Sequence, residues 1–126
     1  MFDHVKFGVS DYEASKAFFL KALAPLGVYK GGEGEPGFGV KLCQPGSEVS
    51  LCLHQTNQKP APLHLDFSAR SCQQVDAFHR KALAAGSLDN GAPGLRPHDH
   101  ADDDATLVIG PDGHKLEAVF HEREAR

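Results

Sequence analysis

The feature that most constrains the fold of this chain is an internal repeat. Residues 64–84 repeat the pattern of residues 4–24 at an offset of 60 positions. The identical pairs are His4 and His64, Phe7 and Phe67, Ala17 and Ala77, Phe18 and Phe78, and the run KALA at 21–24 and 81–84. Repetition at a fixed offset indicates duplicated structural units. We therefore expect a single domain, 1–126, built from module one (about residues 1–56) and module two (about residues 62–122).

Each module is expected to begin with a strand and continue as a helix. Apolar residues alternate with polar ones at positions 4–9 and 63–68, which is typical of a strand with one buried face. Ser10 and Ser71 each begin a stretch with capping-box spacing, which predicts the start of a helix. Alternation at 38–42 and 49–53, and again at 105–109 and 115–121, predicts a hairpin at the end of each module.

The resulting prediction is an α+β fold of two tandem βαβββ modules. They would form a curved, cup-like mixed sheet with the helices on its outer face, and the second strand of each module is poorly defined. The segments 31–37 and 91–104 are expected to be loops because they are rich in glycine or polar residues. Asp102, Asp103 and Asp104 are expected to face solvent, since burying adjacent carboxylates is costly.

Composition narrows the class of protein. A net charge of −4 gives no electrostatic reason to expect nucleic acid as a partner. No apolar run approaches the roughly 18–20 residues that span a bilayer, and no signal-peptide pattern is present, so a membrane partner is not expected either. Three cysteines without CxxC spacing favour a reducing compartment, which predicts a cytoplasmic protein.

One face of the expected sheets is polar and carries candidate metal ligands. Both first strands begin with histidine, and aligning His54 with His121 places Ser50 opposite Glu117. If the modules converge, His4, His64 and Glu117 form a set of two imidazoles and one carboxylate, which binds a divalent metal and leaves positions open for substrate. The alternative is that the histidines are ordinary hydrogen-bonded groove residues and that Glu117 pairs with Lys115 or Arg123.

Five stretches of the chain carry a resemblance to a known family: HVKFGVSDYEASKAFFLKALAPLG, LHLDFSA, VDAFHRKALAAG, DNGAPGLRPH and GPDGHKLEAVFH. They resemble the vicinal oxygen chelate superfamily, which includes glyoxalase I, bleomycin-resistance and fosfomycin-resistance proteins, and extradiol dioxygenases. The resemblance implies paired βαβββ modules around a central metal and often a homodimer. It places the metal ligands at His4, His64 and Glu117. Ser50 stands where glyoxalase I has a fourth ligand, a glutamate, so a standard glyoxalase I is not expected.

The resemblance also implies that the loop containing Arg96, His98 and His100 borders the cup. These residues and His54 are candidates for substrate binding, with a plain solvated loop as the alternative. The remaining histidines, His79, His114 and His121, are expected at the surface or at the rim of the groove. Cys52 is expected on the polar face.

Two functions remain open. The first is a metal-dependent enzyme, a lyase, isomerase or dioxygenase, whose small oxygen-rich substrate chelates a divalent ion (Zn, Fe, Mn, Ni or Mg) through two oxygens. Thiol transfer to an epoxide antibiotic would use the same ligands. The second is a non-catalytic protein that binds a small molecule or antibiotic, as bleomycin-resistance proteins do, and needs no metal. No catalytic residue beyond the expected ligands is identified.

Overall fold

The computed structural model describes the backbone of residues 1–96 and 100–121 and the side chains of residues 1–94 and 103–121. Module one consists of β1 (His4–Val9), α1 (Tyr12–Leu23), η1 (Ala24–Leu26), β2 (Tyr29–Glu33), β3 (Val40–Cys43) and β4 (Ser50–Gln55). Module two consists of β5 (His64–Ser68), α2 (Cys72–Ala84), β6 (Leu88–Asp89), β7 (Gly94–Arg96), β8 (His100–Ile109), η2 (Pro111–Gly113) and β9 (Lys115–His121).

The two sheets share one topology. Module one has the strand order β1-β4-β3-β2, and module two has the order β5-β9-β8-β6, with β7 also pairing with β8. In each module the first strand runs parallel to the last one, and the other pairs are antiparallel. The predicted α+β fold with two βαβββ modules is therefore confirmed, and each module keeps an open sheet of its own.

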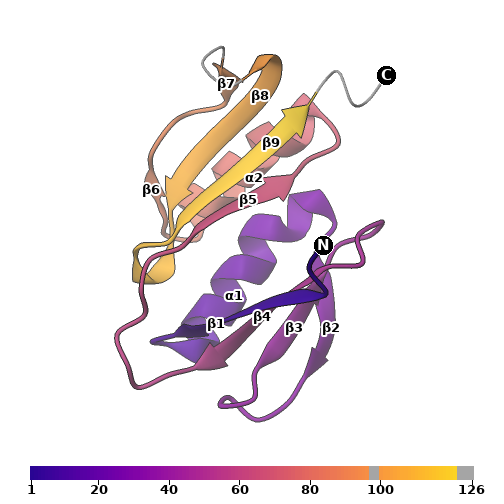
Figure 1. Cartoon of the computed structure of the whole chain (residues 1–126). Coiled ribbons are helices and arrows are strands. Elements are labelled where there is room, and N and C mark those ends of the chain that lie inside the picture. Colours follow the sequence, from indigo (N-terminus) through magenta and orange to yellow (C-terminus); the bar gives the residue numbers. More distant parts are fainter. Residues whose placement is uncertain (97–99, 122–126) are drawn as a thin grey trace.

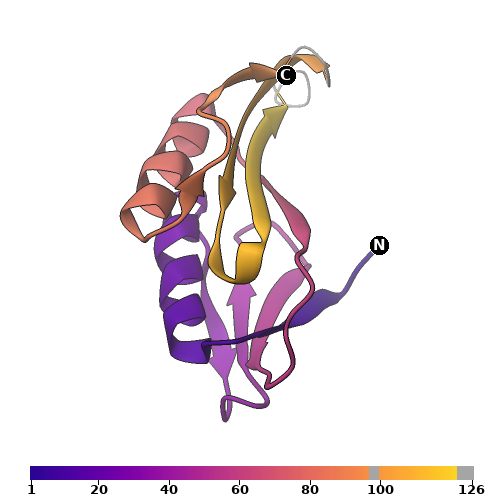
Figure 2. The same ribbon diagram turned by 90° about the vertical axis from the view of Figure 1, so that its left-hand side faces the viewer.

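Both helices cover the same side of the two sheets, which leaves the opposite face of each sheet open (Figure 2). The largest fully buried side chains are Phe19 and Phe78, and each lies near the middle of its helix, α1 or α2. At the boundary between modules, β1 and β5 are the facing edge strands and run in opposite directions (Figure 1). Because His4 opens β1 and His64 opens β5, the two histidines lie at opposite ends of this boundary.

The helix caps differ from the predicted pattern in one place. Ser71 caps α2 as expected, since its hydroxyl accepts the N–H of Gln74 at 3.1 Å. Helix α1 is capped by Asp11 instead of Ser10. Ser10 donates its backbone N–H and its hydroxyl to the carboxylate of Asp112, at 3.1 and 2.5 Å, and so joins the end of β1 to module two.

Two segments expected to be loops contain strands. Residues 31–33 belong to β2, and β8 begins at His100, inside the expected loop 91–104. Asp103 and Asp104 are only 5% and 8% exposed, so the prediction that they face solvent is wrong. Pairing of β8 with β9 buries them, and His121 compensates the Asp103 carboxylate through a contact of 2.9 Å between Nδ1 and Oδ1. The side chain of Asp102 lies outside the described residues.

His114 is fully buried, which contradicts its expected place at the surface. Its Nδ1 accepts the backbone N–H of Leu63 at 2.9 Å, and its ring meets Phe7 of β1 edge to face, with 5.0 Å between the ring centroids. Burial lowers the pKa of this imidazole, and the nearby Asp112 carboxylate opposes that shift. The sequence gives no warning of this role, because the apolar partner comes from the other module.

Candidate functional site

The open face of module two brings together two of the three expected metal ligands. Parallel pairing of β5 with β9 aligns Asp66 with Glu117. His64 lies two residues before Asp66 in β5, and its side chain is therefore on the same face. His64 Nε2 lies 3.0 Å from Glu117 Oε1. The His64 side chain is 56% exposed and the Glu117 side chain 13%, so the carboxylate is sheltered while the imidazole remains accessible.

His4 lies on the open face of module one, where its Nδ1 is 2.8 Å from Asp3 Oδ1. His4 opens β1 and His64 opens β5. Because these two strands run in opposite directions (Figure 1), their first residues lie at opposite ends of the boundary between the modules. Among the residues that the structure describes, no three His, Cys, Asp or Glu side chains are arranged to hold a metal ion. A single chain thus supplies an imidazole and a carboxylate at one place and the second imidazole at another.

The spacing of His64 and Glu117 fits a divalent metal. Two adjacent ligands of an octahedral ion, each about 2.1 Å from it, lie about 3 Å apart. An imidazole nitrogen beside a carboxylate oxygen is also a suitable donor set. A plain ion pair has the same spacing, as His79 and Asp89 show with 3.1 Å between Nε2 and Oδ1. The spacing therefore fits a metal and an ion pair equally well, and no third ligand accompanies the pair within the described residues.

Asp66 is a further candidate that the motif analysis did not single out. Asp66 is exposed as a whole residue. Partial desolvation on the sheet face, followed by the nearby Glu117 carboxylate, raises its pKa to about 6, while His64 and His121 oppose the shift. A carboxyl group with this pKa can exchange protons near neutral pH. Alternation placed Asp66 on the polar face, but only the parallel register of β5 and β9 sets it beside Glu117.

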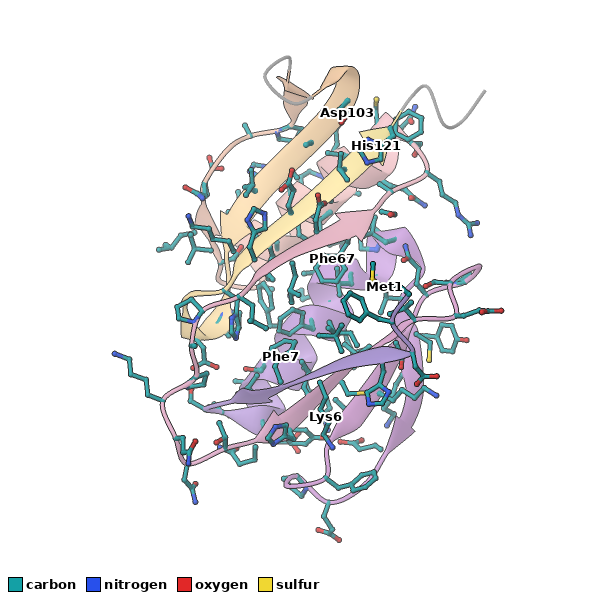
Figure 3. The ribbon with its side chains drawn as sticks, in the orientation of Figure 1. Met1, Lys6, Phe7, Phe67, Asp103 and His121 are labelled. Carbon is teal, nitrogen blue, oxygen red and sulfur yellow. The ribbon has the colours of Figure 1, made fainter. Side chains whose placement is uncertain are left out.

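The same face continues toward the far end of β9, where His121 contacts Asp103 of β8 (Figure 3). Within the described residues, the open face of module two therefore presents two contacts between histidine and carboxylate, with Asp66 near both. Asp103 and His121 contribute to the electrostatic environment of Asp66, in opposite directions.

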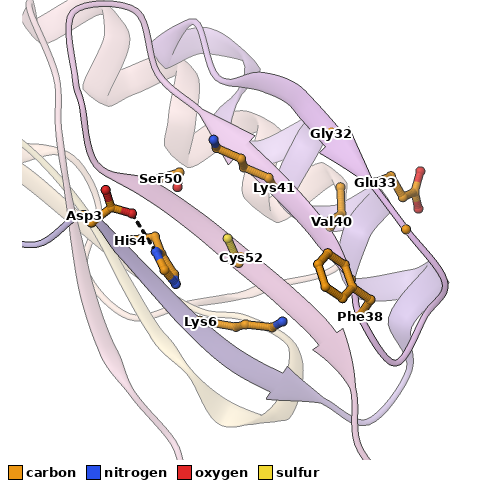
Figure 4. A pocket seen from close by; sticks show the side chains of 12 residues that line it. Asp3, His4, Lys6, Gly32, Glu33, Phe38, Val40, Lys41, Ser50 and Cys52 are labelled. Carbon is orange, nitrogen blue, oxygen red and sulfur yellow. Dashed lines mark hydrogen bonds and ion pairs between the residues drawn. The ribbon is translucent and has the colours of Figure 1, made fainter.

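Module one carries a cavity of about 380 Å³ on its open face (Figure 4). Strand residues His4, Lys6, Lys41, Ser50 and Cys52 contribute to its lining, so Cys52 lies on the polar face as predicted. Ser50 is only 8% exposed. Neither His64 nor Glu117 takes part in this lining.

Of the four expected substrate residues, only His54 has a side chain within the described part of the chain. The side chains of Arg96 and His100, and the whole of His98, lie outside the described residues. His54 lines a separate hollow with Phe7, Gly8 and the linker 58–61, and its Nδ1 lies 3.2 Å from the backbone oxygen of Gln55. This hollow shares no lining residue with the cavity of module one.

The chain thus combines two repeated βαβββ modules with polar open sheet faces, and we compared it with known protein families. The sequence model of the Glyoxalase/Bleomycin resistance protein/Dioxygenase superfamily matches residues 1–118. The chain belongs to this superfamily.

Three solved structures illustrate the range of proteins with this fold. A glyoxalase/bleomycin resistance protein from Albidiferax ferrireducens T118 is 29% identical, with a TM-score of 0.81, and the match covers 96% of this chain and 98% of that one. Oxidase ChaP-H2 is 19% identical, with a TM-score of 0.69 and coverage of 96% and 93%. TnmS3, an antibiotic-binding protein from Streptomyces sp. CB03234, is 20% identical, with a TM-score of 0.70 and coverage of 95% and 94%. At 19% and 20% identity, the similarity to ChaP-H2 and TnmS3 shows that the fold is shared and nothing further.

No curated protein matches the chain in sequence. Within the described residues, every helix is too short or too polar to cross a membrane.

Proposed function

We propose that this protein is a metal-dependent enzyme that acts on a small, oxygen-rich molecule. His64 and Glu117 of one subunit and His4 of a second copy would hold the ion, which would be Zn, Fe, Mn, Ni or Mg. The observation that carries this proposal is the 3.0 Å spacing between Nε2 of His64 and Oε1 of Glu117 on an open sheet face. The family supports it, because its members include dioxygenases and glyoxalases.

A homodimer is the assembly that would complete the ligand set. His4 and His64 lie on different sheets and at opposite ends of the module boundary, so a second copy facing these sheets could bring its His4 to the His64 and Glu117 pair. The large apolar side chain of Phe2, near the N-terminus, supports a covered face, since it is 62% exposed.

When bound, the metal supplies a positive charge that stabilises an oxyanion developing on the substrate. The described side chains provide the remaining functions. Asp66 accepts a proton from the substrate, because its pKa of about 6 leaves it ionised but basic near neutral pH. In the metal-free chain, desolvation is the main cause of the raised pKa of Asp66 and the Glu117 carboxylate adds to it. Without the metal, Glu117 also holds the His64 imidazole in place through the 3.0 Å contact. A lyase, isomerase or dioxygenase reaction is compatible with these roles.

Elemental analysis of protein purified without a nickel column tests the proposal. We expect one divalent ion per subunit in the wild type, and loss of most of it in His64→Ala, Glu117→Gln and His4→Ala. His79→Ala is the matched control, because it removes a histidine of α2 that lies similarly close to a carboxylate, Asp89 of β6. Light scattering should give the mass of a dimer. Metal-free wild-type protein, or full metal content in His4→Ala, would contradict the proposal.

A second candidate is a protein that binds a small molecule without catalysis. The cavity of module one favours it, because the cavity is formed without His64 and Glu117, and the antibiotic-binding protein TnmS3 has the same fold. Retention of a ligand by the His4→Ala/Glu117→Ala double variant would support this function, and strict dependence of binding on a metal would exclude it.

We also propose a reducing compartment, the cytoplasm, as the location. Cys43 and Cys52 are both free thiols, which supports this assignment.

A further inference from the structure

Two lysines flank a thiol in the cavity of module one. Strand pairing aligns Lys6 of β1 and Lys41 of β3 with the same residue, Cys52 of β4, which lies between them. All three line the cavity (Figure 4). Because neighbouring strands are about 4.8 Å apart, the two lysine Cα atoms are about 10 Å apart, within reach of one small ligand between their flexible side chains.

The carboxylates that share the cavity offset the positive charge of these lysines only in part. Glu33 is engaged by Lys16 and Lys30, at 2.6 and 3.1 Å, and neither of these lysines lines the cavity. Asp3 is hydrogen-bonded to His4. Within the described part of the chain, Lys6 and Lys41 form no salt bridge of their own, although Lys41 helps to lower the pKa of Asp3 at longer range.

The cavity also has an apolar wall. The ring of Phe38 is 73% exposed, and the Lys6 ammonium lies 4.8 Å from its centroid. The backbone of Gly32 and Gly34 forms part of the rim without adding side-chain bulk. An anion with an apolar or planar part would satisfy both features at once, since the charge meets the ammonium groups and the remainder packs on the ring.

We propose that this cavity binds the carboxylate or phosphate group of a small organic acid between Lys6 and Lys41, with the apolar part of the acid against Phe38. The substrate class is therefore a small organic acid. This inference rests on the proposed function only in the position of the bound acid relative to the metal. His4 also lines the cavity, so the bound acid would extend toward the metal that His4 helps to hold. Binding of the anion itself requires only one chain.

Cys52 provides a reporter inside the proposed site, because its thiol is half-buried in the cavity floor. Iodoacetate, an anion, and iodoacetamide, which is neutral, both form a bond from sulfur to carbon, release iodide and leave the thiol proton to solvent. The quantity measured by mass spectrometry is the rate of Cys52 alkylation by iodoacetate divided by the rate with iodoacetamide. We expect this ratio to fall about threefold in Lys6→Met or Lys41→Met and about tenfold in the double variant. Lys59→Met, in the linker, is the control. An unchanged ratio in the double variant would overturn the proposal.

Competition identifies the anionic group. Benzoate or phenyl phosphate should protect Cys52 from iodoacetamide, and the one effective at lower concentration identifies carboxylate or phosphate as the preferred group. Equal protection by benzyl alcohol, or none by either acid, overturns the proposal.

The same competition separates this proposal from the metal site. In metal-free His64→Ala/Glu117→Gln protein, protection that persists supports an anion site in module one. Protection that disappears with the metal overturns that site. Absence of metal from the wild type, with protection intact, contradicts the proposed enzyme function alone.

Discussion

The Nδ1 atom of His114 accepts the backbone N–H of Leu63 at 2.9 Å, so the imidazole that precedes β9 holds the start of β5 in place. The ring also packs against Phe7 of β1 and therefore contacts both modules. Among the described residues, its Nε2 has no hydrogen-bond partner. The histidine thus has one satisfied nitrogen in a dry environment, which disfavours its protonated form.

We predict that His114 makes folding stability depend on pH. Its pKa is lowered on folding, so the folded protein binds fewer protons than the unfolded chain, and stability declines as pH falls below about 6.5. His114→Gln retains an acceptor for the Leu63 amide but cannot titrate. Urea unfolding at pH 7.5 and 5.5 should show a smaller loss of stability in the variant than in the wild type, and equal losses would contradict this role.

Asp66 should produce a pH dependence of its own. Its pKa is raised to about 6 in the folded protein, so the folded state binds more protons than the unfolded chain between about pH 4 and 6, and stability falls as pH rises through this window. We expect Asp66→Asn to be more stable than the wild type at pH 7.5, by on the order of 1 kcal/mol after allowance for solvent screening. This advantage should vanish below pH 4.

The control for Asp66 is Asp76→Asn, which changes an exposed carboxylate on α2. Urea unfolding of the three proteins across this pH range measures the difference. A gain of stability in Asp76→Asn as large as that in Asp66→Asn would show a general effect of net charge instead of a local one. If Asp66 also accepts the substrate proton, Asp66→Asn loses activity while it gains stability.

Gly39 should tolerate no side chain. Its φ of +106° lies in the left-handed region, and a Cβ there would collide with the backbone oxygen of Leu53. We expect Gly39→Ala to lower the free energy of unfolding by at least about 2 kcal/mol, measured with urea. Gly37→Ala is the control, because its Cβ would meet no atom within 4 Å. A comparable loss in both variants would show that the crowding at Gly39 is not the cause.

The hydroxyl of Tyr12 should stabilise the contact between α1 and β2. Tyr12 is 3% exposed and donates to Glu33 Oε2 at 2.6 Å, and desolvation together with this carboxylate raises its pKa to about 12. Tyr12→Phe should cost about 1–2 kcal/mol in urea unfolding at pH 7. Tyr29→Phe, at a position 54% exposed, should cost much less. Similar costs at the two positions would contradict the assignment.

The sequence patterns of short segments were sufficient to predict the first strand of each module and the start of α2. Alternating apolar residues in β1 and β5 and the Ser71 cap of α2 were predictable because each depends on residues near in sequence. The cap of α1 was not predictable, because the Ser10 hydroxyl donates a hydrogen bond to Asp112, a residue more than a hundred positions away. The burial of Asp103 and Asp104 follows from pairing with β9, which the charge pattern alone did not indicate.

The same distinction between local and long-range determinants applies to the candidate site. The sequence by itself determined the two modules, their polar faces and the residue types that could bind a metal, because duplication and alternation are properties of short segments. Only the tertiary structure decided that His64 meets Glu117, that His4 lies on the other sheet, that Asp66 acquires a raised pKa, and that Lys6 and Lys41 flank Cys52. The physical reason is that these relationships depend on strand register and on the opposite directions of β1 and β5, which are set by packing between segments distant in the chain.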